Sequence, residues 1–571
     1  MTGLSLSVPA KRDSVWLAET DPKYARVWLG TLPLADSAEA AREIYQALYT
    51  LNRQTLDATQ RFELMELYGS PVALVTTALE SYYVRAPLPL SPKKRQLAEF
   101  IRQLHMEMAY GYKACLQDTE QQRLRWGKKS LRAHALERAL YYLGEVLLHS
   151  CQVYMPYPPE VWRELHAIYR YGTEHHLATE VVQMAEPLGK KTTLELDYIR
   201  VLLLGLSSPY QLPQNEYRQV QRFLYHWGAK AVIRDKLDAP HPAGHFLIDP
   251  AADAPPGLFP RDGLTEPNPA MRLLDAVELL STIQFFIQRL EKGESAQTLS
   301  IGLDSLDTAC LEVLQRMQRS WGLVPRRRHS RIQRSSPVFV CAGIPALHFF
   351  ASGQKPFTAP VTNVSGSMAD DRFILAAHIE EDISRETKQD EEFIALDEPA
   401  GNAALSPATD VVMTSNIIFR VDHWQIKDVA PKGLQLVRQS NARTTVRVGD
   451  LVGIQQMEDV GRWSVGMVRW MKSPQTDQLE MGAELLAPDV LPVTVAPARR
   501  TGEQDYQSAL LLPAVDAVHR PVTLLLPRGV FMPDADLMLM QEGSAPRTVR
   551  LLKRLEHSNI FESFVFADVL T

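Results

Sequence analysis

The sequence predicts a multidomain protein in which an α-helical part precedes a β-stranded part. The chain has 571 residues, which is too long for one ordinary core, because domains typically hold about 100–200 residues. Apolar residues recur at three- and four-residue spacing from Ala38 to about Trp321, the period of an amphipathic helix. Beyond Trp321, short strand-like segments alternate with turn residues, which favours small antiparallel barrels or sandwiches. Because the helices come first and the strands follow, separate domains are predicted rather than one doubly wound sheet.

The first predicted domain spans residues 1–321 and is an all-α helical bundle or array. Ser91 followed by Pro92 is a helix start signal, an N-cap residue before proline at the first helical position. Amphipathic stripes of this kind bury their apolar faces against one another, which favours a bundle or array. The segment 238–269 holds eight prolines, each of which removes a backbone donor, so irregular structure is predicted there. Helices are expected near 56–68, 71–84, 92–108, 131–147, 158–168, 194–206, 215–227, 268–290 and 303–319.

Two β domains are predicted to follow, at 322–498 and 499–571. The first is expected to be an antiparallel β-barrel with strands near 337–341, 446–454, 463–471 and 479–486. The second is expected to be a small C-terminal β module. Residues 365–410 differ from their surroundings, because they contain twelve acidic and three basic residues and therefore a net charge of −9. This composition predicts a flexible, solvated insertion within the barrel domain.

Composition and motifs exclude several classes of function. The net charge of −6 does not fit a general nucleic-acid coat. The four cysteines form no CxxC pair and show no metal-ligand spacing, so no metal site, disulfide framework or cofactor is expected. The sequence has no phosphate-binding GxxxxGK[ST] loop, no G-x-S-x-G elbow and no HExxH motif, so an enzyme is not predicted. It also has no signal peptide and no membrane-spanning apolar run, so a cytoplasmic location is expected.

An arginine cluster immediately before the first predicted strand is the sharpest local feature. It contains Arg326, Arg327, Arg328 and Arg331, which we take as candidate ligand-binding residues. A guanidinium group is planar, stacks on aromatic rings, and binds both phosphate and the O6 and N7 atoms of guanine through paired donors. The cluster therefore suits a ligand that carries both guanine and negative charge, although Arg326 and Arg328 equally fit solvated charges at the rim of a site.

A second candidate segment lies at 424–436 and reads as strand, tight turn and strand. Asp428 near the end of the first strand is able to accept hydrogen bonds from the N–H groups of a guanine edge. Gly433 allows either a positive φ in the turn or a close approach of the backbone to a ligand. The two segments together predict a nucleotide site built from arginines, one carboxylate and a glycine turn.

These residues resemble the motifs of the PilZ domain, a small β-barrel family. The family pattern is RxxxR before a strand and (D/N)xSxxG after a further strand, and here it is met by Arg327 and Arg331, then Asp428, Ala430 and Gly433. Downstream runs at 448–452, 463–470 and 481–485 are also similar, so the resemblance covers about 326–495. Many PilZ domains bind the bacterial second messenger cyclic di-GMP, and the sequence has no GGDEF or EAL motif of the enzymes that make or degrade it.

The resemblance implies a role for each matching residue. Arg327 and Arg331 would bind guanine and phosphate, Asp428 would hold a guanine edge, and Gly433 would permit the turn. Ala430 stands where the family has serine, so one hydroxyl contact worth about 0.5–1.5 kcal/mol is missing.

The sequence therefore predicts a signalling receptor that binds cyclic di-GMP where the helical domain joins the PilZ-like barrel. Ligand binding would be coupled to an unidentified protein partner through the helical domain. The alternative is a helical adaptor or scaffold with a degenerate barrel that binds no nucleotide, for which Ala430 is the indication. A third hypothesis, contact with RNA or DNA through the arginines, is not favoured, because the rest of the chain is acidic and lacks a basic face with interleaved aromatic residues.

Overall fold

The computed structural model divides the chain into two compact units. The first comprises Met1–Arg328 with Trp470–Thr476, and the second comprises His329–Arg469 with Asp477–Thr571. The structure describes residues 6–12, 18–121, 128–184, 190–237, 242–260, 268–303, 306–322, 331–357, 409–414, 417–440, 442–459, 461–498, 506–515, 520–558 and 560–569.

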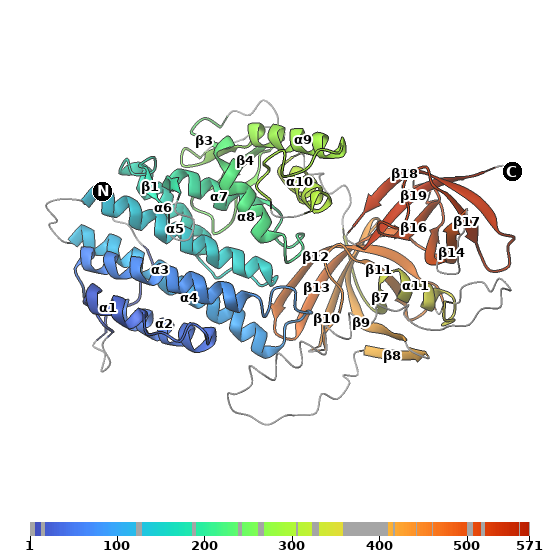
Figure 1. Ribbon diagram of the computed structural model, residues 1–571, viewed down its shortest axis with the longest axis horizontal. Helices are drawn as coiled ribbons and strands as arrows, with labels where there is room; N and C mark the ends of the chain where they lie inside the picture. Colours follow the sequence, from blue (N-terminus) through green and yellow to red (C-terminus); the bar gives the residue numbers. More distant parts are fainter. Residues whose placement is uncertain are drawn as a thin grey trace, which may run out of the picture. The chain divides into compact units, whose positions relative to one another are not determined.

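The first unit consists mainly of helices (Figure 1). Its long helices α4 and α5 pack along each other, with α3 against α4 and α7 against α5. The predicted helical N-terminal region is thus confirmed. The helices are α1 (Pro22–Leu29), α2 (Ser37–Leu51), α3 (Ala58–Glu80), α4 (Pro92–Gln121), α5 (Lys128–Gln152), α6 (Val161–Glu174), α7 (Leu194–Leu206), α8 (Tyr217–Trp227), α9 (Val277–Glu291) and α10 (Asp307–Trp321).

Helix α3 replaces two helices that the sequence analysis separated at Pro71. The helix begins where the side chain of Asp57 accepts hydrogen bonds from the N–H groups of Thr59 and Gln60. It then continues through Pro71, although proline removes one helical hydrogen bond. Buried residues on both sides of the proline, among them Leu64 and Val75, anchor the two halves in the same core. Tertiary packing therefore outweighs the local helix-breaking preference.

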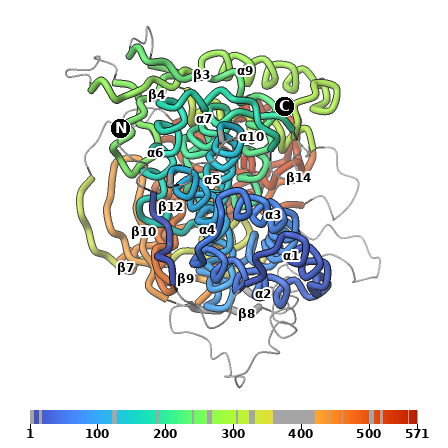
Figure 2. The backbone as a smooth tube through the Cα atoms, turned by 90° about the vertical axis from the view of Figure 1, so that its left-hand side faces the viewer, coloured from blue at the N-terminus to red at the C-terminus, as the bar shows by residue number. Residues whose placement is uncertain are grey.

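A four-stranded antiparallel sheet also belongs to the first unit, and the sequence analysis did not predict it. Its strands are β3 (Val232–Arg234), β4 (His245–Ile248), β5 (Gly257–Leu258) and β6 (Arg272–Asp275), in the order β3-β6-β4-β5. The prolines of 238–269 lie between these strands rather than within them, so each strand keeps its backbone donors. Strand β6 also shortens the helix expected at 268–290, and β3, β4 and α9 lie together in both views (Figure 1, Figure 2). A two-stranded ribbon, β1 (Val182–Gln183) with β2 (Lys191–Thr192), completes the unit's described strands.

The second unit contains a barrel formed by six strands that pair in a ring. The ring runs β7-β9-β10-β13-β12-β11 and returns to β7, because β10 pairs with β9 as well as with β13. Strand β9 also pairs near its start with β8, which extends the sheet outside the ring. The strands are β7 (Ile332–Ala342), β8 (Thr409–Thr414), β9 (Ile417–Ala430), β10 (Gly433–Gln439), β11 (Leu451–Gln456), β12 (Ser464–Gln475) and β13 (Gln478–Ala487).

A second closed barrel follows in the same unit, in the order β14-β15-β16-β19-β18-β17. This arrangement confirms the predicted order of a helical part followed by β-rich parts. Helix α11 (Gly343–Ala351) packs against β7 and β11 of the first barrel and against β14, β15 and β16 of the second. The strands are β14 (Leu491–Pro497), β15 (Gln507–Leu512), β16 (Thr523–Pro527), β17 (Asp536–Met540), β18 (Arg547–His557) and β19 (Phe561–Asp568).

One buried cluster joins the two barrels of the second unit. It holds Leu347 and Phe349 of α11, Leu451 of the first barrel, and Leu510 and Phe561 of the second. The two barrels therefore share an apolar core through α11. Of the predicted acidic insertion, only its last two residues are described, as the start of β8. None of the described helices combines the length and the apolar composition that crossing a membrane requires.

Candidate ligand-binding site

The structure brings together two residues that the sequence analysis placed in separate motifs. The Nη1 atom of Arg331 lies 2.8 Å from Oδ2 of Asp428, and it also donates to Oε1 of Gln435 at 3.1 Å. Asp428 is on β9, Gln435 is on β10, and Arg331 immediately precedes β7. The start of β7 and the neighbouring strands β9 and β10 thus meet at one point of the first barrel, although about 100 positions separate Arg331 from its two partners. Arg326, Arg327 and Arg328 lie outside the described residues.

A β-bulge turns Asp428 towards the outer face of the barrel. Ile426 of β9 pairs with Leu436 of β10, and both are buried in the barrel interior. By simple alternation Asp428 would also point inward, two positions further along the strand. Instead the register shifts, and Asp428 pairs with Gln435, which is next to Leu436 and faces the other way. The pairing of β9 with β7 shifts at the same place. A bulge re-aims a side chain in this way, so the carboxylate meets Arg331 outside the barrel.

The hairpin after Asp428 is a two-residue turn, Pro431 and Lys432, between paired Ala430 and Gly433. Gly433 has ordinary strand geometry as the first residue of β10, so the positive φ considered from the sequence does not occur there. The space around it requires glycine for another reason. A Cβ atom at this position would lie 2.9 Å from the backbone oxygen of Ala483 on β13. Gly433 therefore permits close approach of two strands rather than a turn.

Three residues next to this pair were not singled out from the sequence. Gln435 donates from Nε2 to Oε2 of Glu480 at 3.1 Å, and Lys427 donates from Nζ to Oε1 of Glu480 at 3.2 Å. Of these three residues, Gln435 could have been found from the sequence. In a two-residue hairpin that pairs Ala430 with Gly433, the residue two positions before the first is opposite the residue two positions after the second. Gln435 was thus predictable as the neighbour of Asp428, whereas Glu480 depends on the pairing of β10 with β13.

A second arginine–aspartate pair lies within the same barrel. Nη2 of Arg438 on β10 is 3.3 Å from Oδ1 of Asp422 on β9, and the arginine side chain is 1% exposed. Burial lowers the pKa of Arg438, and the charge of Asp422 opposes this shift. In contrast, the side chain of Arg331 is 34% exposed. The Asp422–Arg438 pair is therefore shielded from solvent, whereas the Arg331–Asp428 pair is accessible to a ligand.

The outer pair still has hydrogen-bonding capacity for a ligand. Among the residues that the structure describes, the hydrogen bonds of Arg331 all come from Nη1, so Nε and Nη2 remain as donors. Asp428 is itself 6% exposed beneath Arg331. The arrangement offers cationic donors at the surface above a carboxylate acceptor, which suits a ligand with both an anionic group and N–H donors.

Comparisons with known proteins identify this barrel. Residues 245–492 match the family described as "Cyclic-di-GMP receptor FimW, middle PilZ domain". This part of the chain thus matches a PilZ domain. Residues 23–239 match "Cyclic-di-GMP receptor FimW, N-terminal domain", and residues 493–569 match "FimW C-terminal beta-barrel domain". The first barrel of the second unit is thus a PilZ barrel, as its motifs indicated.

A curated relative resembles the chain along almost its whole length. This protein of Pseudomonas aeruginosa is named "Cyclic-di-GMP receptor FimW", and it is 27% identical over 592 aligned residues. The alignment covers 99% of this chain and 93% of the relative. The similarity therefore extends to the helical part, the PilZ barrel and the second barrel together.

Proposed function

We propose that the protein is a cyclic di-GMP receptor and that Arg331 and Asp428 form part of its nucleotide site. The observation that carries the proposal is their ion pair on the outer face of the PilZ barrel. It joins residues from both motifs, which are 97 positions apart in the sequence. The relative named as a cyclic di-GMP receptor supports the same ligand.

The chemistry of the pair fits both halves of a guanine nucleotide. Arginine binds the O6 and N7 acceptors of guanine through paired donors, and it also pairs with phosphate. Asp428 accepts from the opposite, N–H-bearing edge of the base. The existing contact orients the two side chains before ligand arrives, which lowers the conformational cost of binding. Arg327, and with it Arg326 and Arg328, would add further cationic contacts by analogy with the family motif.

We further propose that ligand binding changes how the protein presents its helical part to a protein partner. Arg327 and Arg331 of the first motif are four positions apart, and the chain passes from the first unit to the second between Arg328 and His329. The proposal is that a ligand bound by these arginines has different affinities for different conformations of the protein. Such a ligand shifts the equilibrium between conformations by as much as its affinities for them differ. The cytoplasm is the expected site of action.

The competing function is an adaptor whose barrel binds no nucleotide, and Ala430 favours it. The missing hydroxyl removes one neutral hydrogen bond of about 0.5–1.5 kcal/mol, at most about a tenfold loss of affinity. Because the charged contacts of Arg331 and Asp428 remain, we favour a binding-competent site.

Isothermal titration calorimetry with the purified full-length protein tests this choice. We expect heat on addition of cyclic di-GMP, and no comparable heat with cyclic di-AMP, which has the same charge but lacks guanine. The double variant Arg327→Ala/Arg331→Ala should bind at least 100-fold more weakly, since each charge-assisted hydrogen bond contributes about 1.5–3 kcal/mol.

Arg334→Ala is the matched control. Arg334 is an exposed arginine three positions along, which contacts Ser336 and Gln456 rather than Asp428. It should leave the affinity within about twofold. Absence of heat with the wild type, or equal affinity in the double variant, would favour the adaptor.

A further inference from the structure

A second group of polar side chains lies inside the helical unit, far from the barrel motifs in sequence. His105 of α4 and Glu145 and His149 of α5 each place one ligand atom within 4.8 Å of the other two. All three side chains are buried, with 4%, 3% and 0% exposure. The cluster has two imidazoles and one carboxylate and contains no cysteine. It plays no part in the proposed nucleotide site.

Helix geometry explains why these residues converge. Glu145 and His149 are four positions apart on α5, so their side chains lie on the same face. Helix α4 packs along that helix and brings His105 to the same level. The cluster was not predicted from the sequence, because its members come from two helices and match no short motif.

The distances within the cluster match those of a metal centre. Nε2 of His105 and Nε2 of His149 are 3.1 Å apart, and Oε2 of Glu145 is 3.9 Å from Nε2 of His149. Two nitrogen ligands at about 2.0–2.1 Å from a tetrahedral Zn²⁺ are separated by about 3.3 Å. The three ligand atoms are thus close enough to coordinate one ion with small adjustments of their side chains.

The surroundings of His149 prepare its Nε2 atom as a ligand. Nη2 of Arg218 lies 3.3 Å from this atom, and because arginine only donates, Nε2 of His149 acts as the acceptor. The proton of this ring is then on Nδ1, which lies 2.7 Å from the hydroxyl oxygen of Tyr83. A hydrogen bond to the distal ring nitrogen is the usual support of a metal-binding histidine.

His105 needs a change of tautomer to act as the second nitrogen ligand. Its Nε2 faces the acceptor nitrogen of His149 and therefore carries a proton in the absence of metal. Its Nδ1 is buried without a hydrogen-bond partner among the described residues. On metal binding the proton would move from Nε2 to Nδ1, which leaves the number of protons on the ring unchanged.

Arg218 is the group with which a metal ion would compete. Its Nη1 donates to Oε2 of Glu145 at 2.8 Å, so it now supplies the positive charge that this carboxylate requires. Arg218 has a second carboxylate as well, because its Nη2 and Nε donate to Glu80 at 2.7 and 3.2 Å. It can therefore release Glu145 without losing its ion pair.

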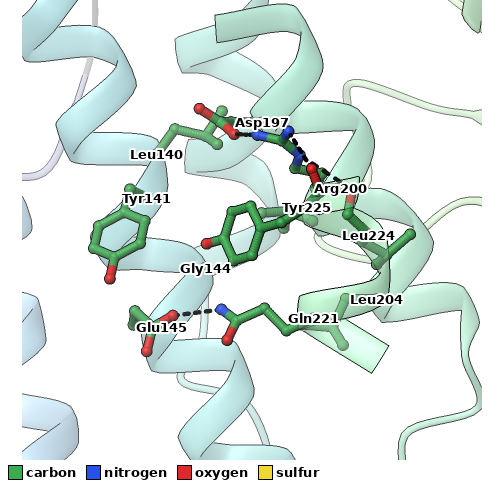
Figure 3. Close-up of a pocket in the computed structure, with 11 residues that line it drawn as sticks. Leu140, Tyr141, Gly144, Glu145, Asp197, Arg200, Leu204, Gln221, Leu224 and Tyr225 are labelled. Carbon is green, nitrogen blue, oxygen red and sulfur yellow. Dashed lines mark hydrogen bonds and ion pairs between the residues drawn. The ribbon is translucent and has the colours of Figure 1, made fainter. Parts of the chain in front are cut away.

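Glu145 connects the cluster to a neighbouring pocket of the helical unit. This residue also lines a pocket between α5, α7 and α8, where its Oε1 accepts a hydrogen bond from Nε2 of Gln221 at 2.6 Å (Figure 3). Tyr141 and Tyr225 point into the same pocket. The side chain of Arg218 beside it is 32% exposed. One oxygen of this carboxylate thus faces the histidines and the other faces the pocket.

We propose that His105, Glu145 and His149 bind one divalent transition-metal ion, with Zn²⁺ as the best match. Two imidazoles and one carboxylate form a known zinc ligand set and leave a fourth position for water. The ion would link α4 to α5, and its binding would stabilise the folded helical unit. The site concerns stability and architecture of the first unit and does not depend on the proposed nucleotide function.

Titration of metal-depleted full-length protein with Zn²⁺ alone, followed by equilibrium dialysis and metal analysis, tests the proposal. We expect one tightly bound equivalent and a rise in Tm. His105→Gln and His149→Gln should each weaken binding at least 100-fold, since loss of an outer-shell partner alone typically costs about 10–100-fold. Tyr83→Phe should weaken binding about tenfold while all three ligands remain.

Control variants separate this site from other histidines. His134→Gln alters a half-buried histidine of α5, and His166→Gln alters a buried histidine of α6 that contacts Tyr198. Both should leave stoichiometry and affinity unchanged, and the second controls for destabilisation. His175→Gln/His176→Gln removes an exposed pair that could bind metal adventitiously. Full loss of binding in that double variant would overturn the proposal.

Two further measurements keep the proposal testable if ligand variants fail to fold. Arg218→Gln should bind Zn²⁺ at least tenfold more tightly, because it removes the competing cation; a purely structural polar cluster predicts no such gain. In wild-type protein labelled with ¹⁵N-histidine, Zn²⁺ should shift the imidazole signals of two of the 15 histidines. No bound equivalent, or no shifted imidazole signal, would refute the site.

Discussion

The PilZ barrel contains two arginine–aspartate pairs whose aspartates both lie on β9, and the two pairs differ in what surrounds them. Asp422 and Arg438 meet in the barrel interior, where the arginine is 1% exposed. Asp428 and Arg331 meet on the outer face, where the arginine is 34% exposed. Six positions and one β-bulge along β9 separate the two carboxylates. The two carboxylates are similarly buried, so the pairs differ in how far their arginines are exposed to water.

The difference shows how burial assigns a role to an ion pair. A buried pair holds two desolvated charges, and removal of either partner leaves the other without compensation. In the outer pair only the carboxylate is buried, and water and salt compensate a partly exposed guanidinium more easily than a buried one. The inner pair is therefore a fixed part of the barrel, whereas the outer pair is free to exchange its contacts for those of a ligand.

The largest expected effect is on the inner pair. Asp422→Ala should lower the free energy of unfolding of the second unit by about 3–5 kcal/mol, because it removes the carboxylate that faces the buried Arg438 guanidinium. Chemical denaturation followed by tryptophan fluorescence measures this loss. The apolar double variant Asp422→Leu/Arg438→Met should recover most of it. If Asp428→Ala proves as destabilising as Asp422→Ala, the contrast between the two pairs is wrong.

The next effect is on binding at the outer pair. Asp428→Asn keeps the shape of the side chain but removes its charge, so cyclic di-GMP affinity should fall about tenfold to 150-fold, the equivalent of about 1.5–3 kcal/mol. The stability should fall by less than it does in Asp422→Ala, because the remaining Arg331 is partly exposed to water. Calorimetric titration and denaturation of the same sample measure both quantities. A loss of stability without a loss of affinity would reverse the roles assigned to the two pairs.

A change in the hairpin that carries Asp428 tests whether the outer pair depends on its position. Gly433→Ala places a Cβ atom against the backbone oxygen of Ala483, so the barrel should lose about 1–3 kcal/mol of stability. Because the paired strands must then shift, nucleotide affinity should fall as well. Gly449→Ala, in a loop with φ of 93°, is strained at its own backbone but has open space around it. It should lower stability without weakening binding.

The smallest effect is an expected gain. Ala430→Ser restores the hydroxyl of the family motif and should tighten cyclic di-GMP binding by up to about tenfold, the equivalent of about 0.5–1.5 kcal/mol. Competition against a labelled nucleotide resolves a change of this size. The free energy of unfolding, to which the inner pair contributes, should remain unchanged. A weaker affinity in this variant would show that Ala430 does not face the ligand.

Local patterns in the sequence predicted the elements of the site but not their orientation. The motif residues and the tight turn were recognisable because they are close together in the chain. The bulge was not, since its register depends on the hydrogen bonds that β9 makes with two neighbours. For the same reason the partner of Gln435 on β13 could not be named.

In the helical part too, local patterns predicted individual elements but not the features that depend on packing between distant segments. The helix at 194–206 was predicted with the bounds that the structure gives. The break expected at Pro71 was wrong, because buried residues on both sides hold α3 together. Strand β4 was not predicted because of the prolines within 238–269, and it is stabilised by pairing with β6, whose partner residues lie 24 to 30 positions later. The cluster of His105 with His149 likewise depends on packing between helices, which no periodicity within one segment reveals.

The core that α11 shares with both barrels determines where the second unit can be truncated. Leu510 and Leu525 of the second barrel are fully buried in the same cluster as Leu347 of α11. A chain truncated before Leu491 would expose this apolar surface to water, and large exposed patches of this kind promote aggregation. The isolated PilZ barrel is therefore a poor choice for recombinant expression, and residues up to the end of β19 belong in any shortened version made for ligand studies.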